Sequence, residues 1–156
     1  MKVMVIMKGE ASPEYTPPPT EVFRMMGAFN MRLAEAGVLL DAKGLFPSSQ
    51  ARRVTLDAGA PRVTDGPFAE TKELLVGYWT LQVESLDEAL EWMRQSPLEG
   101  SGIEIELRTV GELDNFGDTF TDDLLPDHAR LLDLVRRNNE RAYAYVGERA
   151  AASATP

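Results

Sequence analysis

The chain has 156 residues, of which 44% are hydrophobic and 26% are charged, as expected for one folded domain with an appendage. Its net charge is −9 and it contains no cysteine, which excludes a disulfide framework, a thiolate nucleophile and a cysteine-based metal site. Direct nucleic-acid binding is not expected, because phosphate contacts need clustered Lys and Arg. No apolar run approaches the ~18 residues of a membrane span, and the apolar start MKVMVIMK is too short for a secretory leader, so we expect a cytoplasmic protein.

The first elements in the chain are a strand and a helix. Residues 2–8 are apolar at both alternations, which predicts a central strand covered on both faces. An amphipathic helix should begin with Thr20 as its N-cap and end at Gly37. Its apolar positions recur with helical spacing and comprise Val22, Met25, Met26, Phe29, Leu33 and Ala36. We interpret the methionine pair as core filler rather than as a soft metal ligand.

A second strand and a hairpin follow. Residues 38–45 predict a strand with two alternating faces, Val38, Leu40 and Ala42 on one and Leu39, Asp41 and Lys43 on the other. Residues 52–56 and 62–64 flank a short turn sequence and predict a β-hairpin.

The stretch VTDGPFAETKELL, residues 63–75, combines a turn with a charge cluster. Gly66 and Pro67 prevent a strand from continuing, so the backbone must turn there. Phe68 is expected to be buried, and four charged residues should remain near the rim of the turn: Asp65, Glu70, Lys72 and Glu73. The stretch is either a structural loop with solvated charges or the lip of a ligand site.

The second half repeats the strand–helix–strand order. Residues 74–83 are rich in aromatic and β-branched residues and predict a strand, in which Gly77 marks a bulge or a close backbone approach. Ser85 and Glu88 form a capping box for a helix that Pro97 ends. Residues 103–110 then alternate cleanly between apolar and charged residues.

This order predicts an α+β fold, a ferredoxin-like split βαβ sandwich with an inserted hairpin and both helices on one sheet face. The opposite face should carry charged side chains together with a large aromatic residue, Tyr78 or Trp79; the charged set is Glu104, Glu106 and Arg108, with Asp41 and Lys43 from the second strand. Such a face is either solvated or covered by a second subunit, which would leave a partly polar cavity between the two copies.

The C-terminal part has a different composition. Residues 111–127 carry six acidic residues and no basic residue, and they should be extended. Asp127 is a candidate cap for an amphipathic helix with an apolar stripe formed by Leu131, Leu132, Val135, Ala142, Tyr145 and Val146, interrupted by Asn138 and Asn139. The nearby His128 is interpreted as a surface or capping residue rather than a catalyst. We therefore divide the chain into a domain at 1–117, an acidic linker and helix at 118–149, and a disordered tail at 150–156.

Several motifs resemble a known family. The string DGPFAETKE at 65–73, the Gly77-Tyr78 pair and the G-L-x-P motif of Gly44, Leu45 and Pro47 are similar to the DGPF or YCII-related domain. So are the residues that close the first helix, AGVL at 36–39, and the last strand, IEIELR at 103–108. The resemblance covers residues 1–117 and implies a homodimeric, ferredoxin-like α/β barrel.

The resemblance also bears on function. Related YciI-type proteins are thought to be enzymes because a His and an Asp lie together in the cavity, but Met25 and Met26 occupy this region here, so that dyad is absent. Proteins of the DGPF type also occur beside, or fused to, extracytoplasmic-function sigma factors. A non-catalytic regulatory or interaction module, with a sigma factor as its partner, is therefore the alternative to a small-molecule cavity.

For a small-molecule cavity the candidate residues divide by role. Asp65 and Glu73 are the catalytic candidates, as carboxylates whose pKa burial would raise. The candidate ligand-binding residues are Asp41, Glu70, Lys72, Tyr78, Glu106 and Arg108, with Lys72 or Arg108 suited to an anionic group. The sequence indicates no cofactor, no metal site and no nucleophile–base pair.

Overall fold

The structure is a computed structural model that describes residues 1–9, 17–56, 59–68 and 74–153. It divides into two compact units, Met1–Val110 and Gly111–Pro156, which we describe separately. The first unit ends at Val110, before the boundary at residue 117 that the sequence suggested.

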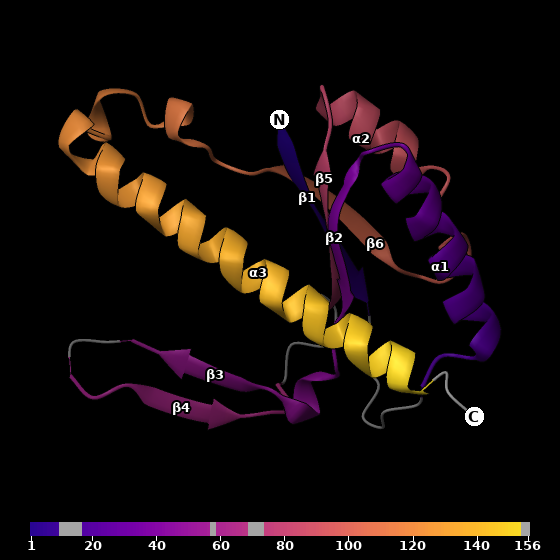
Figure 1. Ribbon diagram of the computed structural model, residues 1–156. Coiled ribbons are helices and arrows are strands. Elements are labelled where there is room, and N and C mark those ends of the chain that lie inside the picture. The colour runs from indigo at the N-terminus through magenta and orange to yellow at the C-terminus, as the bar shows by residue number, and fades with distance from the viewer. Residues whose placement is uncertain (10–16, 57–58, 69–73, 154–156) are drawn as a thin grey trace. The chain divides into compact units, whose positions relative to one another are not determined.

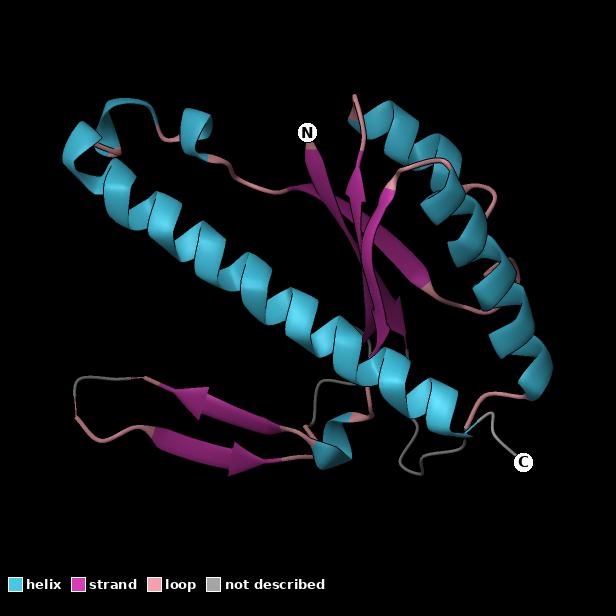
Figure 2. Ribbon diagram, viewed as in Figure 1, coloured by secondary structure: helices cyan, strands magenta, loops and turns pink. Residues whose placement is uncertain are grey.

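The first unit is built on a four-stranded sheet. Its strands are β1 (Lys2–Gly9), β2 (Leu39–Gly44), β5 (Leu74–Gln82) and β6 (Glu104–Thr109), arranged in the order β2-β5-β1-β6 with every neighbouring pair antiparallel. The helices α1 (Thr20–Glu35) and α2 (Leu86–Met93) lie on the same face of this sheet (Figures 1 and 2). This is the predicted α+β, ferredoxin-like arrangement, and within the described residues the sheet is open rather than closed into a barrel.

The core lies between the sheet and the two helices. The strands contribute alternate residues from their inner face, and the helices contribute one stripe each, so that the buried set includes Val3, Val5, Met7, Trp79, Leu81, Phe29, Leu33, Ala89 and Met93. Trp79 is 1% exposed, donates from Nε1 to Asn30 Oδ1 at 2.7 Å, and meets the Phe29 ring edge-on at 6.0 Å between centroids. Its one polar atom is thus satisfied inside the core.

The ends of the helices differ in part from the prediction. Thr20 is the first helical residue and Pro19 precedes it without a side-chain cap, so the predicted Thr20 cap is wrong. Gly37 has a φ of +73°, which confirms it as the left-handed residue that ends α1. Met26 packs against the core as predicted, whereas Met25 is 41% exposed. At α2, the Ser85 hydroxyl accepts from the Glu88 backbone amide at 3.1 Å, as the capping box predicts, whereas the Glu88 carboxylate accepts from the backbone amide of Glu84, one residue before the cap, at 2.7 Å.

A bulge in β2 changes which residues face the core. Leu39 pairs with Leu81 and Asp41 pairs with the adjacent Thr80, so Leu40 is an extra residue in the ladder. The predicted alternation, with Leu40 and Ala42 on one face, is therefore wrong at Leu40, which is 44% exposed. Leu39 and Ala42 pack against the core, and Asp41 lies on the opposite face.

The predicted hairpin forms a separate two-stranded sheet in the stretch of chain that connects β2 to β5. It consists of β3 (Arg52–Thr55) and β4 (Arg62–Asp65), and it follows a short 3₁₀ turn, Ser48–Gln50. Val54 and Val63 face each other across the two strands and are 53% and 57% exposed.

The second unit consists of short turns and one long helix. Three 3₁₀ turns, Leu113–Asn115, Gly117–Thr119 and Asp122–Leu124, occupy the acidic segment that we expected to be extended. The helix α3 (Leu125–Ser153) follows, with Asp127 in its first turn rather than at its cap. It continues beyond residue 149, where we expected a disordered tail to begin. Among the helices of the described ranges, none combines the length and the apolar character needed to cross a membrane.

Candidate functional site

The sheet face opposite α1 and α2 carries most of the polar side chains of the sheet. Strand alternation and the β2 bulge place them in rows across the strands. One row runs through Lys43, Tyr78, Ile6 and Glu106, and the next runs through Asp41, Thr80, Met4 and Arg108. We call this surface the polar sheet face.

A hydrogen-bonded cluster centred on the carboxylate of Asp41 lies at the β2 edge of the polar sheet face. The Tyr78 hydroxyl donates to Asp41 Oδ2 at 2.8 Å, and Lys43 Nζ donates to Asp41 Oδ1 at 2.5 Å. Burial opposes ionisation of Asp41, but the hydrogen bonds from Lys43 and Tyr78 outweigh it and lower the pKa of this carboxyl. Asp41 is therefore ionised at neutral pH and fixes the positions of both donors.

A second cluster lies on β1 and β6. Lys8 Nζ is 2.6 Å from Glu106 Oε2 and 3.7 Å from Glu104 Oε1, and Arg108 Nε donates to Glu106 Oε1. The hydrogen bonds from Lys8 and Arg108 lower the pKa of Glu106. The Lys8 side chain is 18% exposed and that of Arg108 is 67% exposed, so the guanidinium presents its outer edge to solvent.

The DGPF turn lies at the base of the hairpin rather than on the sheet. Arg52 Nε is 2.9 Å from Asp65 Oδ1, and both side chains are about three-quarters exposed, at 76% and 75%. The guanidinium of Arg53 lies over the half-buried Phe68 ring, with Arg53 Cζ 4.4 Å from the ring centroid. Gly66 lies so close to Ser48 that a Cβ atom at position 66 would be 1.7 Å from the Ser48 carbonyl oxygen.

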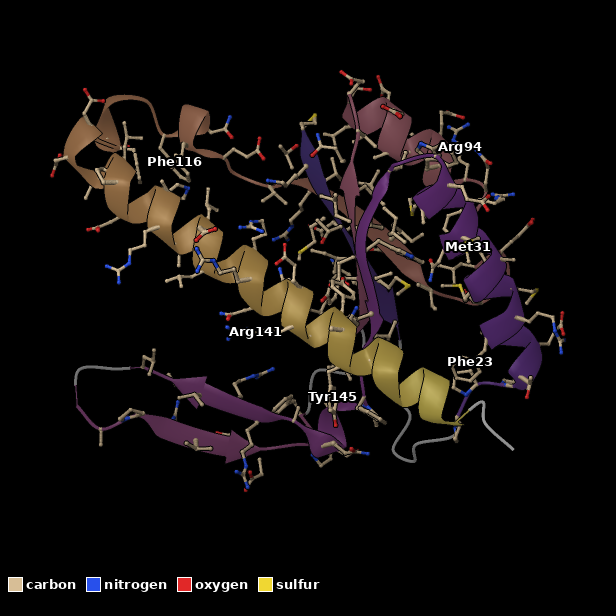
Figure 3. All side chains as sticks on the ribbon, in the orientation of Figure 1. Phe23, Met31, Arg94, Phe116, Arg141 and Tyr145 are labelled. Carbon is tan, nitrogen blue, oxygen red and sulfur yellow. The ribbon has the colours of Figure 1, made fainter. Side chains whose placement is uncertain are left out.

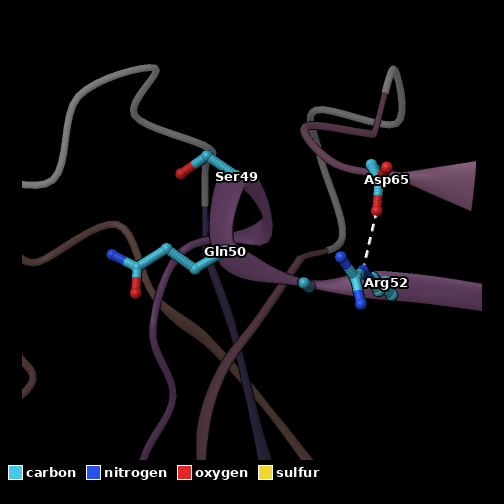
Figure 4. A pocket seen from close by; sticks show the side chains of 5 residues that line it. Ser49, Gln50, Arg52 and Asp65 are labelled. Carbon is cyan, nitrogen blue, oxygen red and sulfur yellow. Dashed lines mark hydrogen bonds and ion pairs between the residues drawn. The ribbon is translucent and has the colours of Figure 1, made fainter.

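An open recess adjoins this turn. It has a volume of about 370 Å³ and is lined by Ser49, Gln50, Ala51, Arg52 and Asp65 (Figure 4). The Arg52–Asp65 ion pair spans one side of it. The recess is open to solvent and offers a guanidinium, a carboxylate, a hydroxyl and an amide.

The structure places the predicted site residues in three groups. It brings Asp41, Tyr78, Glu106 and Arg108 together on the polar sheet face. Asp65 lies on the hairpin in an exposed ion pair. Glu70, Lys72 and Glu73 lie outside the described residues.

Sequence reasoning missed Lys8 as a member of the site. The sequence holds a signal for it: in β1 the even-numbered residues Lys2, Met4, Ile6 and Lys8 lie on one face, and the two lysines mark that face as the more polar one. Among the described residues, no group of three or more His, Asp or Glu side chains could hold a metal ion.

The ionised state of Asp41 makes the stability of the protein depend on pH. Because the pKa of Asp41 is lowered on folding, its contribution is fully present above about pH 4, the range of an unfolded Asp, and is lost as the pH falls further. We expect Asp41→Asn to lower the free energy of unfolding at pH 7 and the difference from the wild type to shrink by pH 3. Urea unfolding at pH 7, 5 and 3 measures this. A difference that is the same at all three pH values would contradict it.

Comparison with known proteins identifies the family. The family model of the YCII-related domain matches residues 1–113. The chain is also 42% identical over 73 residues to an uncharacterised protein of Rhizobium meliloti (strain 1021). That alignment covers 47% of this chain and 59% of the relative, so the chain spans less than two-thirds of the curated relative that it matches. The family match contains β1 to β6 and both core helices, and the chain therefore belongs to the YCII-related domain family.

Proposed function

We propose that this protein binds a small molecule with an anionic group on the polar sheet face, and that a second copy of the chain encloses the site in a homodimeric α/β barrel. The observation that carries the proposal is the presence of two preorganised clusters, Asp41–Tyr78–Lys43 and Lys8–Glu106–Arg108, on the sheet face opposite α1 and α2. Side chains held by hydrogen bonds lose little freedom when a ligand binds, which favours recognition.

The two clusters favour a ligand with an anionic group and an apolar body. Arg108 is the best anion contact, because its guanidinium is always charged and is 67% exposed. Met4, 37% exposed, lies in the row between Arg108 and Thr80 and offers apolar contact. Asp41 and Glu106 have lowered pKa values, so in this proposal they act as hydrogen-bond acceptors or as general bases, not as general acids.

Native mass spectrometry of freshly purified full-length protein tests the proposal. We expect a dimer that carries a non-covalent mass absent from the denatured protein. Arg108→Gln and Tyr78→Phe should each reduce the occupancy of that mass about tenfold, the loss expected for one hydrogen bond to a charged group. Arg94→Gln is the matched control, because Arg94 follows α2, the helix on the opposite side of the sheet.

The outcomes separate the two parts of the proposal. A monomer would contradict enclosure by a second copy. A bound mass that is retained equally in both site variants would place the ligand away from the polar sheet face.

A second candidate function is a cytoplasmic interaction module, with a sigma factor as its partner. One observation favours it over a purely structural tail: α3 carries many exposed apolar side chains, including Leu131, Leu132, Tyr145 and Val146. Capture of a sigma factor by the wild type, but not by Val146→Asp, would support this function. Capture that is equal for both proteins would exclude α3 as the contact.

A further inference from the structure

The helix α3 has one charged half and one apolar half. With 100° per residue, Arg136, Arg137, Asp133 and Glu140 fall within one half of its circumference. Arg136 pairs with Asp133 and Glu140, each at 2.7 Å, and Arg137 pairs with Asp133. These ion pairs link neighbouring turns of the helix and need no partner from outside it.

The other half of α3 is apolar and exposed. Its side chains are 45–62% exposed and comprise Leu131, Leu132, Leu134, Val135, Tyr143, Tyr145 and Val146. Figure 3 shows the side chains along α3, with Arg141 of the charged half and Tyr145 of the apolar half labelled. A helix with this pattern is stabilised by packing of its apolar half rather than by its intrinsic propensity.

The apolar half is symmetric about its centre. One line of residues seven apart is Leu131, Asn138 and Tyr145, and the line beside it is Leu132, Asn139 and Val146. Each line has an asparagine in the middle and an apolar residue on either side. Val135 and Ala142 lie between the two lines. Reversal of the helix direction therefore brings apolar residues opposite apolar residues and each asparagine opposite an asparagine, which suits a two-fold interface, where the same patch of both copies meets.

We propose that α3 pairs antiparallel with α3 of a second copy, with the two-fold axis between Asn138 and Asn139. In this arrangement Leu132 contacts Val146 of the second copy, and Leu131 contacts Tyr145 of the second copy. Each asparagine meets its own counterpart, so amide donors and acceptors satisfy one another inside an apolar seam and fix the register. The opposed helix dipoles also favour the antiparallel direction.

The exposed area is large enough for a stable pair. The seven apolar side chains are about half exposed, which amounts to roughly 700 Å² per copy at typical side-chain areas. A stable interface of standard size buries ~800 Å² per partner. The exposed apolar area of α3 is therefore of the size that a stable pair of helices buries.

Single cysteines test the pairing directly, because this chain contains no cysteine of its own. Asn139→Cys places a thiol beside the proposed axis, and Glu140→Cys places one on the charged half as a matched control. Under mild oxidation we expect Asn139→Cys to form a disulfide-linked dimer roughly 100-fold or more faster than Glu140→Cys, because pairing holds the two thiols at position 139 at an effective concentration in the millimolar range, whereas thiols at position 140 face away from the seam and react only between separate pairs.

The direction of pairing has its own test. Residues 132 and 146 are fourteen apart, about 21 Å along a helix. In an antiparallel pair, Leu132→Cys and Val146→Cys should therefore cross-link only when the two variants are mixed and allowed to exchange. Cross-linking of Leu132→Cys alone would show a parallel pair and overturn the proposal.

The remaining outcomes also decide the question. Equal, slow cross-linking of Asn139→Cys and Glu140→Cys would overturn the pairing. If Asn139→Cys fails to fold, a nitroxide spin label attached to Glu140→Cys provides a second measurement. Paired helices should give a distance between the two labels below roughly 30 Å by electron spin resonance, and the absence of dipolar coupling between the labels would contradict the pairing. The cross-links report only on the α3 pairing, whereas a dimer mass is expected from either interface. A native dimer that lacks the Asn139→Cys cross-link would therefore overturn the α3 pairing and leave the sheet-face dimer standing.

Discussion

Trp79→Ala should lower the free energy of unfolding of the first unit by about 3–5 kcal/mol. The side chain is 1% exposed, so its removal leaves a cavity between the sheet and α1. It also removes the edge-on contact with Phe29 and leaves the side-chain oxygen of Asn30 without the indole donor that lies 2.7 Å from it. For a domain of this size, a loss of that order is a large part of the total stability.

The two tryptophans provide both the probe and the control. Trp92 is the other tryptophan and lies on α2, so its fluorescence reports the unfolding of the first unit in Trp79→Ala. Trp92→Ala deletes the same kind of side chain at a partly buried position and should lower the free energy of unfolding clearly less than Trp79→Ala does. Urea unfolding curves give both values. Equal losses for the two variants would contradict the placement of Trp79 at the centre of the core.

Gly66→Ala should destabilise the hairpin and the DGPF turn by about 2–4 kcal/mol. The added Cβ would lie 1.7 Å from the oxygen and 2.7 Å from the carbon of the Ser48 carbonyl, which are backbone atoms that no rotamer change can move. The two segments would have to separate, with loss of the 3.0 Å hydrogen bond from the Gly66 amide to Ala51 O. The Arg52–Asp65 ion pair and the recess beside it would be lost with them.

Gly44→Ala is the control for this substitution. Gly44 ends β2, and a Cβ at position 44 would meet no atom within 4 Å. We expect limited proteolysis to cut Gly66→Ala within the hairpin while Gly44→Ala resists like the wild type. Equal resistance of the three proteins, together with equal thermal midpoints, would contradict the close packing of Gly66 on Ser48.

The sequence was sufficient for the fold because its periodicities are strong. Clean alternation in residues 103–110 and helical spacing in the first helix each matched an observed element within two residues. The C-terminal segment was predicted less well. Its acidic residues suggested an extended chain. Instead the segment forms local turns, such as the one in which the backbone N–H of Asn115 donates to the backbone carbonyl oxygen of Glu112, and these turns form backbone hydrogen bonds without a hydrophobic core.

The candidate site was predictable only where strand parity determines it. Glu106 and Arg108 could be placed on one face because β6 alternates without interruption. Asp65 was selected as a catalytic candidate because it lies in a distinctive motif, yet the structure explains that motif through packing, with Gly66 against Ser48 and Arg53 over Phe68. The catalytic roles of Asp65 and Glu73 stay predictions, whereas strand parity was enough to place Glu106 and Arg108 on one face.

The bulge at Leu40 has a consequence for relatives that differ in length. The extra residue resets the phase of β2, so that Leu39 faces the core while Asp41 still faces Tyr78. Deleting Leu40 would remove the bulge and place Leu39 next to Asp41, and because successive residues of a regular strand face opposite sides, both would keep their present faces. A homologue that lacks the residue at position 40 should therefore show the same polar–apolar order on both sides of the gap, with a regular strand in place of the bulge and its carboxylate still on the polar sheet face.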